Sequence, residues 1–227
     1  MIPRPENPLI VALDVSELPA AEGLGRTLEG RVGALKIGLE LFSAVGPVDI
    51  ERLQSFAPLF LDLKLHDIPN TVERAAVNVG RLGAAMFTVH ALGGEAMVAA
   101  AVRGAAAGAE RGGHAPPLVL AVTVLSSLAG EGLASPASLA FEARAAGADG
   151  VVVSGEDVSV VREVLDDRAC IVVPGIRPRG SNGHDQVRIL TPEEAIDRGA
   201  DYLVVGRPVT ASSDPAGAAR TIVSSVR

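Results

Sequence analysis

The sequence predicts an α/β protein that folds as a single (β/α)₈ barrel, the TIM barrel, over residues 1–227. Three observations predict this fold class. Eight short apolar runs recur along the chain, helix-length segments lie between them, and no linker or shift in composition divides the 227 residues. Alternating strand and helix patterns are typical of parallel α/β folds, and barrels of roughly 200–250 residues commonly form one domain.

The eight apolar runs, taken in chain order, are rich in Val, Leu and Ile, and most are apolar almost without interruption. This pattern is expected of parallel strands that are covered on both faces. The expected strands are residues 9–15 (LIVALDV), 34–38 (ALKIG), 59–65 (LFLDLKL), 86–91 (MFTVHA), 118–125 (LVLAVTVL), 150–155 (GVVVSG), 170–176 (CIVVPGI) and 202–208 (YLVVGRP).

The segments between the strands are rich in Ala and have helical periodicity. Those such as SPASLAFEARAAGA and TPEEAIDRGA begin at Ser or Thr followed by Pro and end at Gly, which are signals for the start and end of a helix. The alternative fold, a doubly wound sheet, would need a nucleotide-binding fingerprint after its first strand. The nearest candidate, Gly23-Leu24-Gly25, lies inside the first helical segment and has Leu28 where the third glycine should stand.

Composition and charge exclude several classes of partner. The net charge is −7 and no run of Lys or Arg could neutralise a nucleic-acid backbone. No apolar run approaches the roughly 18 residues of a membrane span, and the N-terminus lacks the layout of a signal peptide. The single cysteine, Cys170, lies in an apolar run and is expected to be a buried core thiol. We therefore expect a cytoplasmic protein that binds neither nucleic acid nor membrane.

Charged residues gather at the carboxyl ends of three predicted strands, where barrels of this class carry catalysis. Asp14 ends the first strand, Lys36 lies near the end of the second, Asp62 and Lys64 end the third, and Asp67 lies just past it. Residues two apart on a strand face the same side, here expected to be the barrel mouth. A lysine between two carboxylates favours its charged form, which predicts an acid and not a Schiff-base nucleophile. A surface ion pair is the alternative interpretation.

A second group of residues follows the last two predicted strands, where such barrels commonly bind phosphate. It consists of PGIRPRGSNGHDQ (174–186) and VVGRP (204–208). Arg207 could give a phosphate two parallel hydrogen bonds, and Gly206 would allow the backbone to approach closely. The loop from Arg177 to about Arg188 is longer than usual and is interpreted as a lid, with a surface loop as the alternative.

The remaining reactive residues show no further motif. The four histidines lack the spacing of a metal site, no HExxH or paired cysteine pattern exists, and no GxSxG motif supports a serine hydrolase. We expect His66 and His90 to pack near strand ends.

The motifs VALD, LKIG, LDLKLHDIPNT, VTVLSS and PGIRPRGSNGHDQVRILTPEEAIDRGADYLVVGRPVT together resemble the orotidine 5′-phosphate decarboxylase family of the bacterial kind. The resemblance runs from the first strand to the last helix. The DxKxxD core alone is shared with sugar-phosphate decarboxylases and aldolases of the same suprafamily, whereas the PGIR…DQ…GRP ending makes the match specific.

The resemblance implies decarboxylation of orotidine 5′-monophosphate to UMP and CO₂, the last step of de novo pyrimidine nucleotide synthesis, with no metal or other cofactor. Lys64 matches the lysine that protonates C6 of the pyrimidine, and Asp62 the acid beside the substrate carboxylate. Asp67 matches the acid that reaches into the neighbouring subunit's site, with Ile68 and Thr71 beside it. A homodimer is therefore implied.

The resemblance also implies the remaining substrate contacts. Asp14 and Lys36 match residues that contact the ribose, and Ser126 matches a hydroxyl near the pyrimidine, where relatives often have Thr. The matching phosphate contacts are Arg177, Gln186, Gly206 and Arg207, with Gln186 bridging phosphate and base.

Two alternative functions stay open at this point. A metal-dependent sugar-phosphate decarboxylase or aldolase would need a further acid for Mg²⁺, and Glu40 is the nearest candidate. A non-catalytic UMP-binding barrel would have no need of an Asp-Lys-Asp row beside its ligand.

Overall fold

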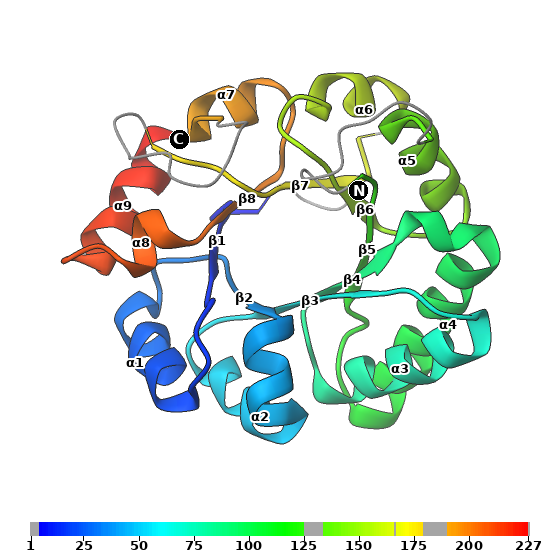
Figure 1. Cartoon of the computed structure of the whole chain (residues 1–227), viewed down its shortest axis with the longest axis horizontal. Coiled ribbons are helices and arrows are strands. Elements are labelled where there is room, and N and C mark those ends of the chain that lie inside the picture. Colours follow the sequence, from blue (N-terminus) through cyan, green and yellow to red (C-terminus); the bar gives the residue numbers. More distant parts are fainter. Residues whose placement is uncertain (1–4, 125–133, 166, 179–189, 227) are drawn as a thin grey trace.

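The computed structural model describes residues 5–124, 134–165, 167–178 and 190–226. Its strands form one closed parallel barrel in chain order, with β8 paired to β1, and the helices form a ring around it (Figure 1). The predicted fold class is confirmed. The strands are β1 (Leu9–Ala12), β2 (Ala34–Gly38), β3 (Leu59–Leu65), β4 (Met86–His90), β5 (Leu118–Val122), β6 (Gly150–Val152), β7 (Cys170–Val173) and β8 (Tyr202–Val205).

The ends of several strands differ from the prediction. β2 and β3 have the predicted bounds, but β1 ends at Ala12 and not at residue 15, and β4, β5, β6, β7 and β8 also end earlier than predicted. Residues beyond these ends, such as Leu13, Val153 and Ile176, are still 0–1% exposed. They belong to the same apolar cluster that packs between the strands and the helices, and an apolar run therefore overestimates the length of the strand.

The helices begin where the sequence signals place them. α5 starts at Pro136 after Ser135, and α7 starts at Pro192 after Thr191, whose side chain forms a capping box with Glu194. The helices are α1 (Leu18–Leu28), α2 (Leu39–Glu51), α3 (Pro69–Leu82), α4 (Gly94–Gly112), α5 (Pro136–Ala145), α6 (Val158–Val164), α7 (Pro192–Asp197), α8 (Arg207–Thr210) and α9 (Pro215–Ser225), with short 3₁₀ turns at η1 (Arg52–Ser55) and η2 (Ala91–Gly93).

The core has two layers because successive residues of each strand face opposite sides. One layer lies between the strands and the helices and includes Val11, Leu35 and Leu61. The other fills the barrel and consists of Ile10, Ala12, Ala34, Phe60, Met86, Leu120, Cys170, Val172 and Val204. Burial raises the pKa of the Cys170 thiol, which lies in this inner layer as an unreactive core residue.

The barrel base, at the amino ends of the strands, is held by two matching aspartates. Asp149 precedes β6 and accepts a hydrogen bond from the N–H of Val119 on β5 at 2.9 Å. Asp201 precedes β8 and accepts from the N–H of Ile171 on β7 at 2.8 Å, and it also forms an ion pair of 2.6 Å with Arg162 of α6. Each carboxylate thus ties one strand to its neighbour at the end of the barrel opposite to the mouth.

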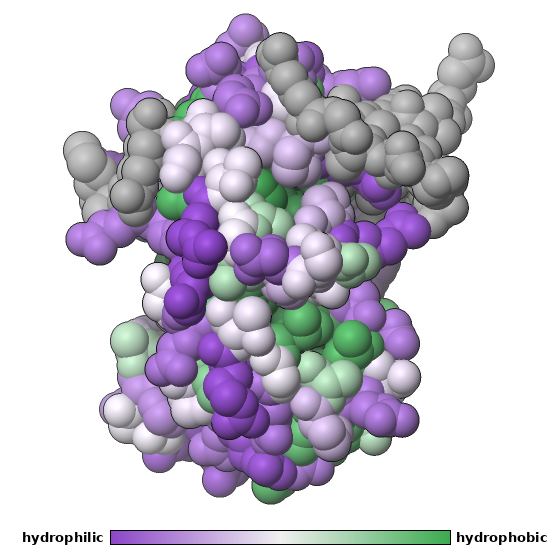
Figure 2. All heavy atoms as spheres, turned by 90° about the vertical axis from the view of Figure 1, so that its left-hand side faces the viewer, coloured by the Kyte–Doolittle hydropathy of each residue, from purple (hydrophilic) through white to green (hydrophobic). Residues whose placement is uncertain are grey.

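The outer surface over α1, α8 and α9 carries mostly hydrophilic and near-neutral residues, and apolar residues form smaller areas between them (Figure 2). Among the described residues, no helix has both the length and the apolar composition that a membrane crossing requires.

Candidate active site

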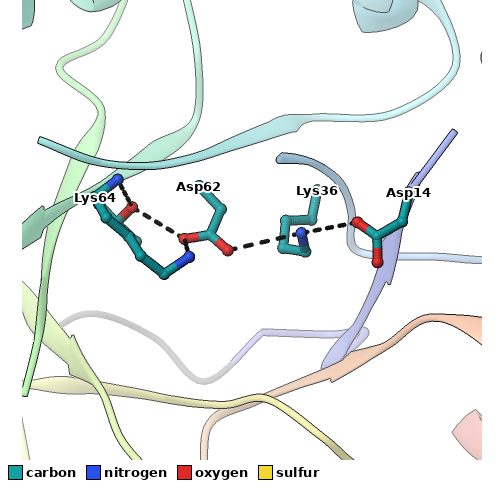
Figure 3. A network of polar contacts seen from close by, with 5 residues as sticks. Asp14, Lys36, Asp62 and Lys64 are labelled. Carbon is teal, nitrogen blue, oxygen red and sulfur yellow. Dashed lines mark hydrogen bonds and ion pairs between the residues drawn. The ribbon is translucent and has the colours of Figure 1, made fainter. Parts of the chain in front are cut away.

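Four charged side chains of alternating sign form a row across the barrel mouth (Figure 3). Lys36 Nζ lies 3.3 Å from Asp14 Oδ1 and 3.6 Å from Asp62 Oδ2, and Lys64 Nζ lies 2.8 Å from Asp62 Oδ1. The row follows from strand alternation: Lys36 is two residues past the inward-facing Ala34, and Asp62 is two residues past the inward-facing Phe60. The apolar filling of the barrel is therefore capped by polar groups.

Burial differs along the row. The side chains of Lys36 and Asp62 are 11% and 16% exposed, while those of Lys64 and Asp14 are 31% and 61% exposed. The two positive and two negative charges balance, and pairing compensates for the partial removal of the inner two from water. Such a row presents an ammonium and a carboxylate side by side to any ligand at the mouth.

The backbone at Lys64 departs from regular strand geometry. The β3–β4 ladder pairs Leu61 with Phe87 and then Leu65 with Val89, so four residues of β3 advance against two of β4. Lys64 has φ 51°, and among the described residues it is the one residue other than glycine with a positive φ. This conformation costs a residue with a Cβ about 1–2 kcal/mol. Simple alternation predicted a common face for residues 62 and 64, but the proximity of their charges depends on this bulge.

Thr88 of β4 holds this bulge and was missed by the sequence reasoning. It is 0% exposed, its hydroxyl accepts from the N–H of Lys64 at 2.8 Å, and it donates to Asp62 Oδ1 at 3.1 Å. A signal existed in the sequence: Thr88 is a polar residue two positions past the inward-facing Met86, in a strand whose first two residues are apolar.

Asp67 does not lie beside Lys64 within this chain, contrary to the expectation of an amine between two carboxylates. Its Oδ1 accepts the N–H of Ile68 at 2.6 Å, and both residues are exposed at the start of α3, as is Thr71. Among the described residues, the amine that lies between two carboxylates is Lys36. Asp67 lies just before α3, which begins at Pro69, and its hydrogen bond is to this helix start and not to the row.

A cavity of about 260 Å³ opens beside the row. Asp14, Lys36 and Asp62 contribute to its lining from β1–β3, and the loops after β7 and β8 contribute the remainder of its polar lining. Its lining residues are Ala12, Asp14, Lys36, Asp62, Pro174, Gly175, Ile176, Arg177, Val204, Gly206, Arg207 and Pro208. Lys64 is not one of the lining residues, but its ammonium contacts Asp62, which is. The cavity thus joins the charged row to two arginines.

The two arginines differ in burial. Arg177 is 7% exposed and its backbone N–H donates to the carbonyl of Leu190 at 3.0 Å, whereas Arg207 is exposed at the start of α8. Gly206 has φ −106°, so it does not need glycine's left-handed freedom. A Cβ there would lie 3.6 Å from Asp14 Oδ2, in the cavity, so its absence leaves room for a ligand.

Two of the expected substrate contacts, Ser126 and Gln186, lie outside the described residues, as does most of the expected lid. Glu40, the candidate for a further metal ligand, is exposed in the first turn of α2 and is not part of the cavity lining. Among the residues that the structure describes, no group of three or more His, Cys, Asp or Glu side chains is arranged to hold a metal ion.

His66 and His90 stack beside the row, with ring centroids 5.2 Å apart. Burial lowers the pKa of His90, and electrostatic interactions with His66 and Lys64 lower it further. His90 Nδ1 accepts the N–H of Leu92 at 3.4 Å, which requires an unprotonated Nδ1. The pair packs at the ends of β3 and β4.

Known proteins are similar to this chain in sequence and in fold. The family model for "Orotidine 5'-phosphate decarboxylase / HUMPS family" matches residues 7–222. The chain is 48% identical over 227 residues to orotidine 5'-phosphate decarboxylase of Paramagnetospirillum magneticum, an alignment that covers 95% of this chain and 97% of the relative. It is 45% identical to the protein of the same name from Syntrophotalea carbinolica, with 98% and 96% covered.

A solved structure shares the whole barrel. The crystal structure of orotidine 5'-phosphate decarboxylase from Lactobacillus acidophilus matches with a TM-score of 0.84 at 37% sequence identity. The match covers 98% of this chain and 100% of that one. The similarity therefore extends over nearly the whole length of both chains.

Proposed function

Because this chain belongs to the orotidine 5′-phosphate decarboxylase / HUMPS family, and is accordingly an enzyme, we propose that it converts orotidine 5′-monophosphate to UMP and CO₂. In this proposal Lys64 protonates C6 and no metal or organic cofactor takes part. The observation that carries it is the row of alternating charges beside a cavity whose loops from β7 and β8 bring two arginines.

The chemistry follows from the position of the ammonium. When the bond between C6 and the carboxylate breaks, CO₂ leaves and the electron pair stays on C6. The Lys64 ammonium stabilises this developing negative charge and then donates a proton to C6, which completes UMP. The resulting neutral amine regains a proton from solvent, to which a side chain that is 31% exposed has access. Asp62, 2.8 Å away, holds the ammonium in place through the reaction.

Asp62 has a second effect in this proposal, because it faces the substrate carboxylate. Two unit charges about 4 Å apart repel by roughly 4 kcal/mol at an effective dielectric near 20. The repulsion falls as neutral CO₂ departs, so it raises the energy of the ground state relative to the transition state. It cannot supply the whole rate enhancement, and most of the stabilisation comes from the preorganised ammonium.

The rest of the substrate spans the cavity. The proposed phosphate contacts are Arg177 and Arg207, and the open space at Gly206 admits the group between them. Asp14 and Lys36 contact the ribose. Binding energy from the remote phosphate can be used to hold C6 against Lys64, so it lowers the barrier and not only KM. Gln186 and Ser126, from outside the described residues, complete the contacts with phosphate and pyrimidine.

The deciding experiment is the fall in absorbance as orotidine 5′-monophosphate is converted, with EDTA present, for wild type and Lys64→Ala. We expect metal-independent turnover by the wild type and its loss in the variant, with unchanged far-UV circular dichroism as the control for folding. A flat trace for folded wild type would contradict the proposed reaction. Conversion of orotidine 5′-monophosphate that EDTA abolishes would contradict the metal-free mechanism, whereas a flat trace would favour the metal-dependent sugar-phosphate class.

The active unit in this proposal is a homodimer in which Asp67 completes the partner's site. Support comes from the rim of the mouth, where Leu39, Ile68 and Leu92 are 56%, 66% and 44% exposed. These apolar residues follow the neighbouring strands β2, β3 and β4, and exposed apolar groups on one rim are typical of an interface. Each protomer would bring its exposed Asp67 to the other's row.

Mixing inactive variants tests the shared site. Lys64→Ala and Asp67→Ala homodimers should each be inactive, whereas a refolded mixture should recover part of the wild-type rate because hybrids contain one intact site. Size-exclusion chromatography with light scattering tests whether the protein is a dimer. Hybrids that form but stay inactive would show that Asp67 does not act across the interface.

A further inference from the structure

Thr88 links the backbone of Lys64, the proposed proton donor, to the carboxylate that the Lys64 ammonium contacts directly. Its hydroxyl accepts the backbone N–H of Lys64 at 2.8 Å and donates to Asp62 Oδ1 at 3.1 Å, while the Lys64 ammonium contacts the same Oδ1 at 2.8 Å. The contacts form a closed ring from the Lys64 backbone through Thr88 and Asp62 to the Lys64 side chain.

The direction of each hydrogen bond in this ring is fixed. The backbone N–H of Lys64 can only donate, so the Thr88 oxygen accepts from it. The single hydrogen of the hydroxyl is then directed to the carboxylate, which can only accept while it is ionised. A valine has the same shape as threonine but could satisfy neither partner, and a serine could satisfy both.

The position of Thr88 in the sheet explains why a side chain is needed. The β3–β4 ladder passes from the Leu61–Phe87 pair directly to the Leu65–Val89 pair, and Lys64 lies in the bulge between them with φ 51°. The Thr88 hydroxyl, on the β4 residue between those two pairs, receives the Lys64 N–H. With Thr88 0% exposed, water does not readily replace this acceptor.

We propose that Thr88 is a positioning residue for the reaction, which holds the left-handed backbone of Lys64 and the Asp62 carboxylate in the arrangement that presents the ammonium to C6. The inference rests on the proposed function of Lys64. Misplacement of a reacting group by about 1 Å can lower a rate by about 10²-fold. Because the ring includes neither of the proposed phosphate contacts, Arg177 and Arg207, its loss should reduce kcat and leave KM near the wild-type value.

The test compares Thr88→Val with Thr88→Ser in the decarboxylation assay. We expect kcat to fall by about 10²-fold in Thr88→Val with KM within threefold of wild type, and to stay within about fivefold of wild type in Thr88→Ser. Thr123→Val is the matched control, because Thr123 is also 0% exposed and its hydroxyl donates to the carbonyl of Val152 at 3.2 Å, not to the row. Its kcat should stay within threefold of wild type.

Several results would overturn the inference. They are an unchanged kcat in folded Thr88→Val, an equal loss in Thr88→Ser, or an equal loss in Thr123→Val. Should Thr88→Val fail to fold, Thr88→Ala provides a second variant without the hydroxyl, with the same expectation.

A crystal structure of the hydroxyl-free variant separates this inference from the proposed function. We expect Lys64 to leave its positive φ and its ammonium to move from Asp62. If wild type is inactive, the proposed function fails, but this structural readout still decides the positioning role. Retention of the wild-type φ and of the Lys64–Asp62 contact would refute it.

Discussion

Asp62→Asn separates the charge of Asp62 from its shape. Asp62 accepts from Lys64 at 2.8 Å and lies 3.6 Å from Lys36, and its side chain is only 16% exposed. An asparagine oxygen can still accept from the Lys64 ammonium and from the Thr88 hydroxyl, so the ring of contacts can persist. The variant therefore loses mainly the negative charge that faces the substrate carboxylate.

The expected size of the effect follows from the geometry. Repulsion of roughly 4 kcal/mol, for charges about 4 Å apart at an effective dielectric near 20, corresponds to about 10³-fold in rate if the transition state relieves all of it. Because water screens the mouth of the barrel, we expect a fall in kcat of about 10²-fold. The ground state loses the same repulsion, so KM should fall by a similar factor and kcat/KM should stay near the wild-type value.

The assay is the absorbance change over a range of substrate concentrations, with UMP affinity measured by calorimetry. UMP lacks the carboxylate, so its Kd should stay within about threefold of wild type. A variant with reduced kcat and unchanged KM would refute the repulsion reasoning, because Asp62 would then act only by placing Lys64.

Three further predictions concern the phosphate site, the barrel base and the histidine pair. Arg207→Ala should lower kcat/KM by about 10²-fold or more with little change in Tm, measured by steady-state kinetics and thermal unfolding, because the side chain is exposed and faces the proposed phosphate. Asp201→Ala removes the acceptor of a buried N–H and the 2.6 Å ion pair with Arg162, and it should lower the free energy of unfolding by about 2–3 kcal/mol and Tm by about 5–10 °C. Unchanged thermal unfolding would contradict a structural role of Asp201. Because the pKa of His90 is lower in the folded state than in the unfolded state, the unfolded state binds a proton more readily as pH falls through about 6.5. The folded protein is therefore more stable above that pH and loses free energy of unfolding below it. His90→Gln should therefore lose less of its free energy of unfolding than wild type between pH 7 and pH 5 in urea titrations, and equal losses would show that His90 is not responsible.

The barrel could be predicted because the sequence features that determine it lie within single strands and helices. Runs such as 34–38 and 59–65 are apolar and short, and Ser or Thr before Pro marks helix starts, so each βα unit is visible in the sequence alone. The gathering of Asp14, Lys36 and Asp62 at one mouth followed from the rule that carboxyl ends of parallel strands meet.

The features of the site that the sequence did not predict depend on contacts between elements that are distant in sequence. The bulge at Lys64 arises because four residues of β3 match two of β4, and no pattern within β3 reports such a mismatch. The role of Thr88 requires knowing that its hydroxyl stands opposite Lys64, 24 residues away. The contact of Asp67 with the Ile68 N–H depends on where α3 begins, and spacing along a strand does not determine it.

The two aspartates at the barrel base have a consequence for how this protein can evolve. Asp149 and Asp201 tie strands together at the end opposite to the mouth, so these contacts stabilise the barrel away from the residues proposed to act on substrate. Selection for a new substrate could then exchange inward residues at the mouth while the base keeps the scaffold intact. A library restricted to the cavity lining should yield a larger fraction of soluble variants than an equally large library at the base.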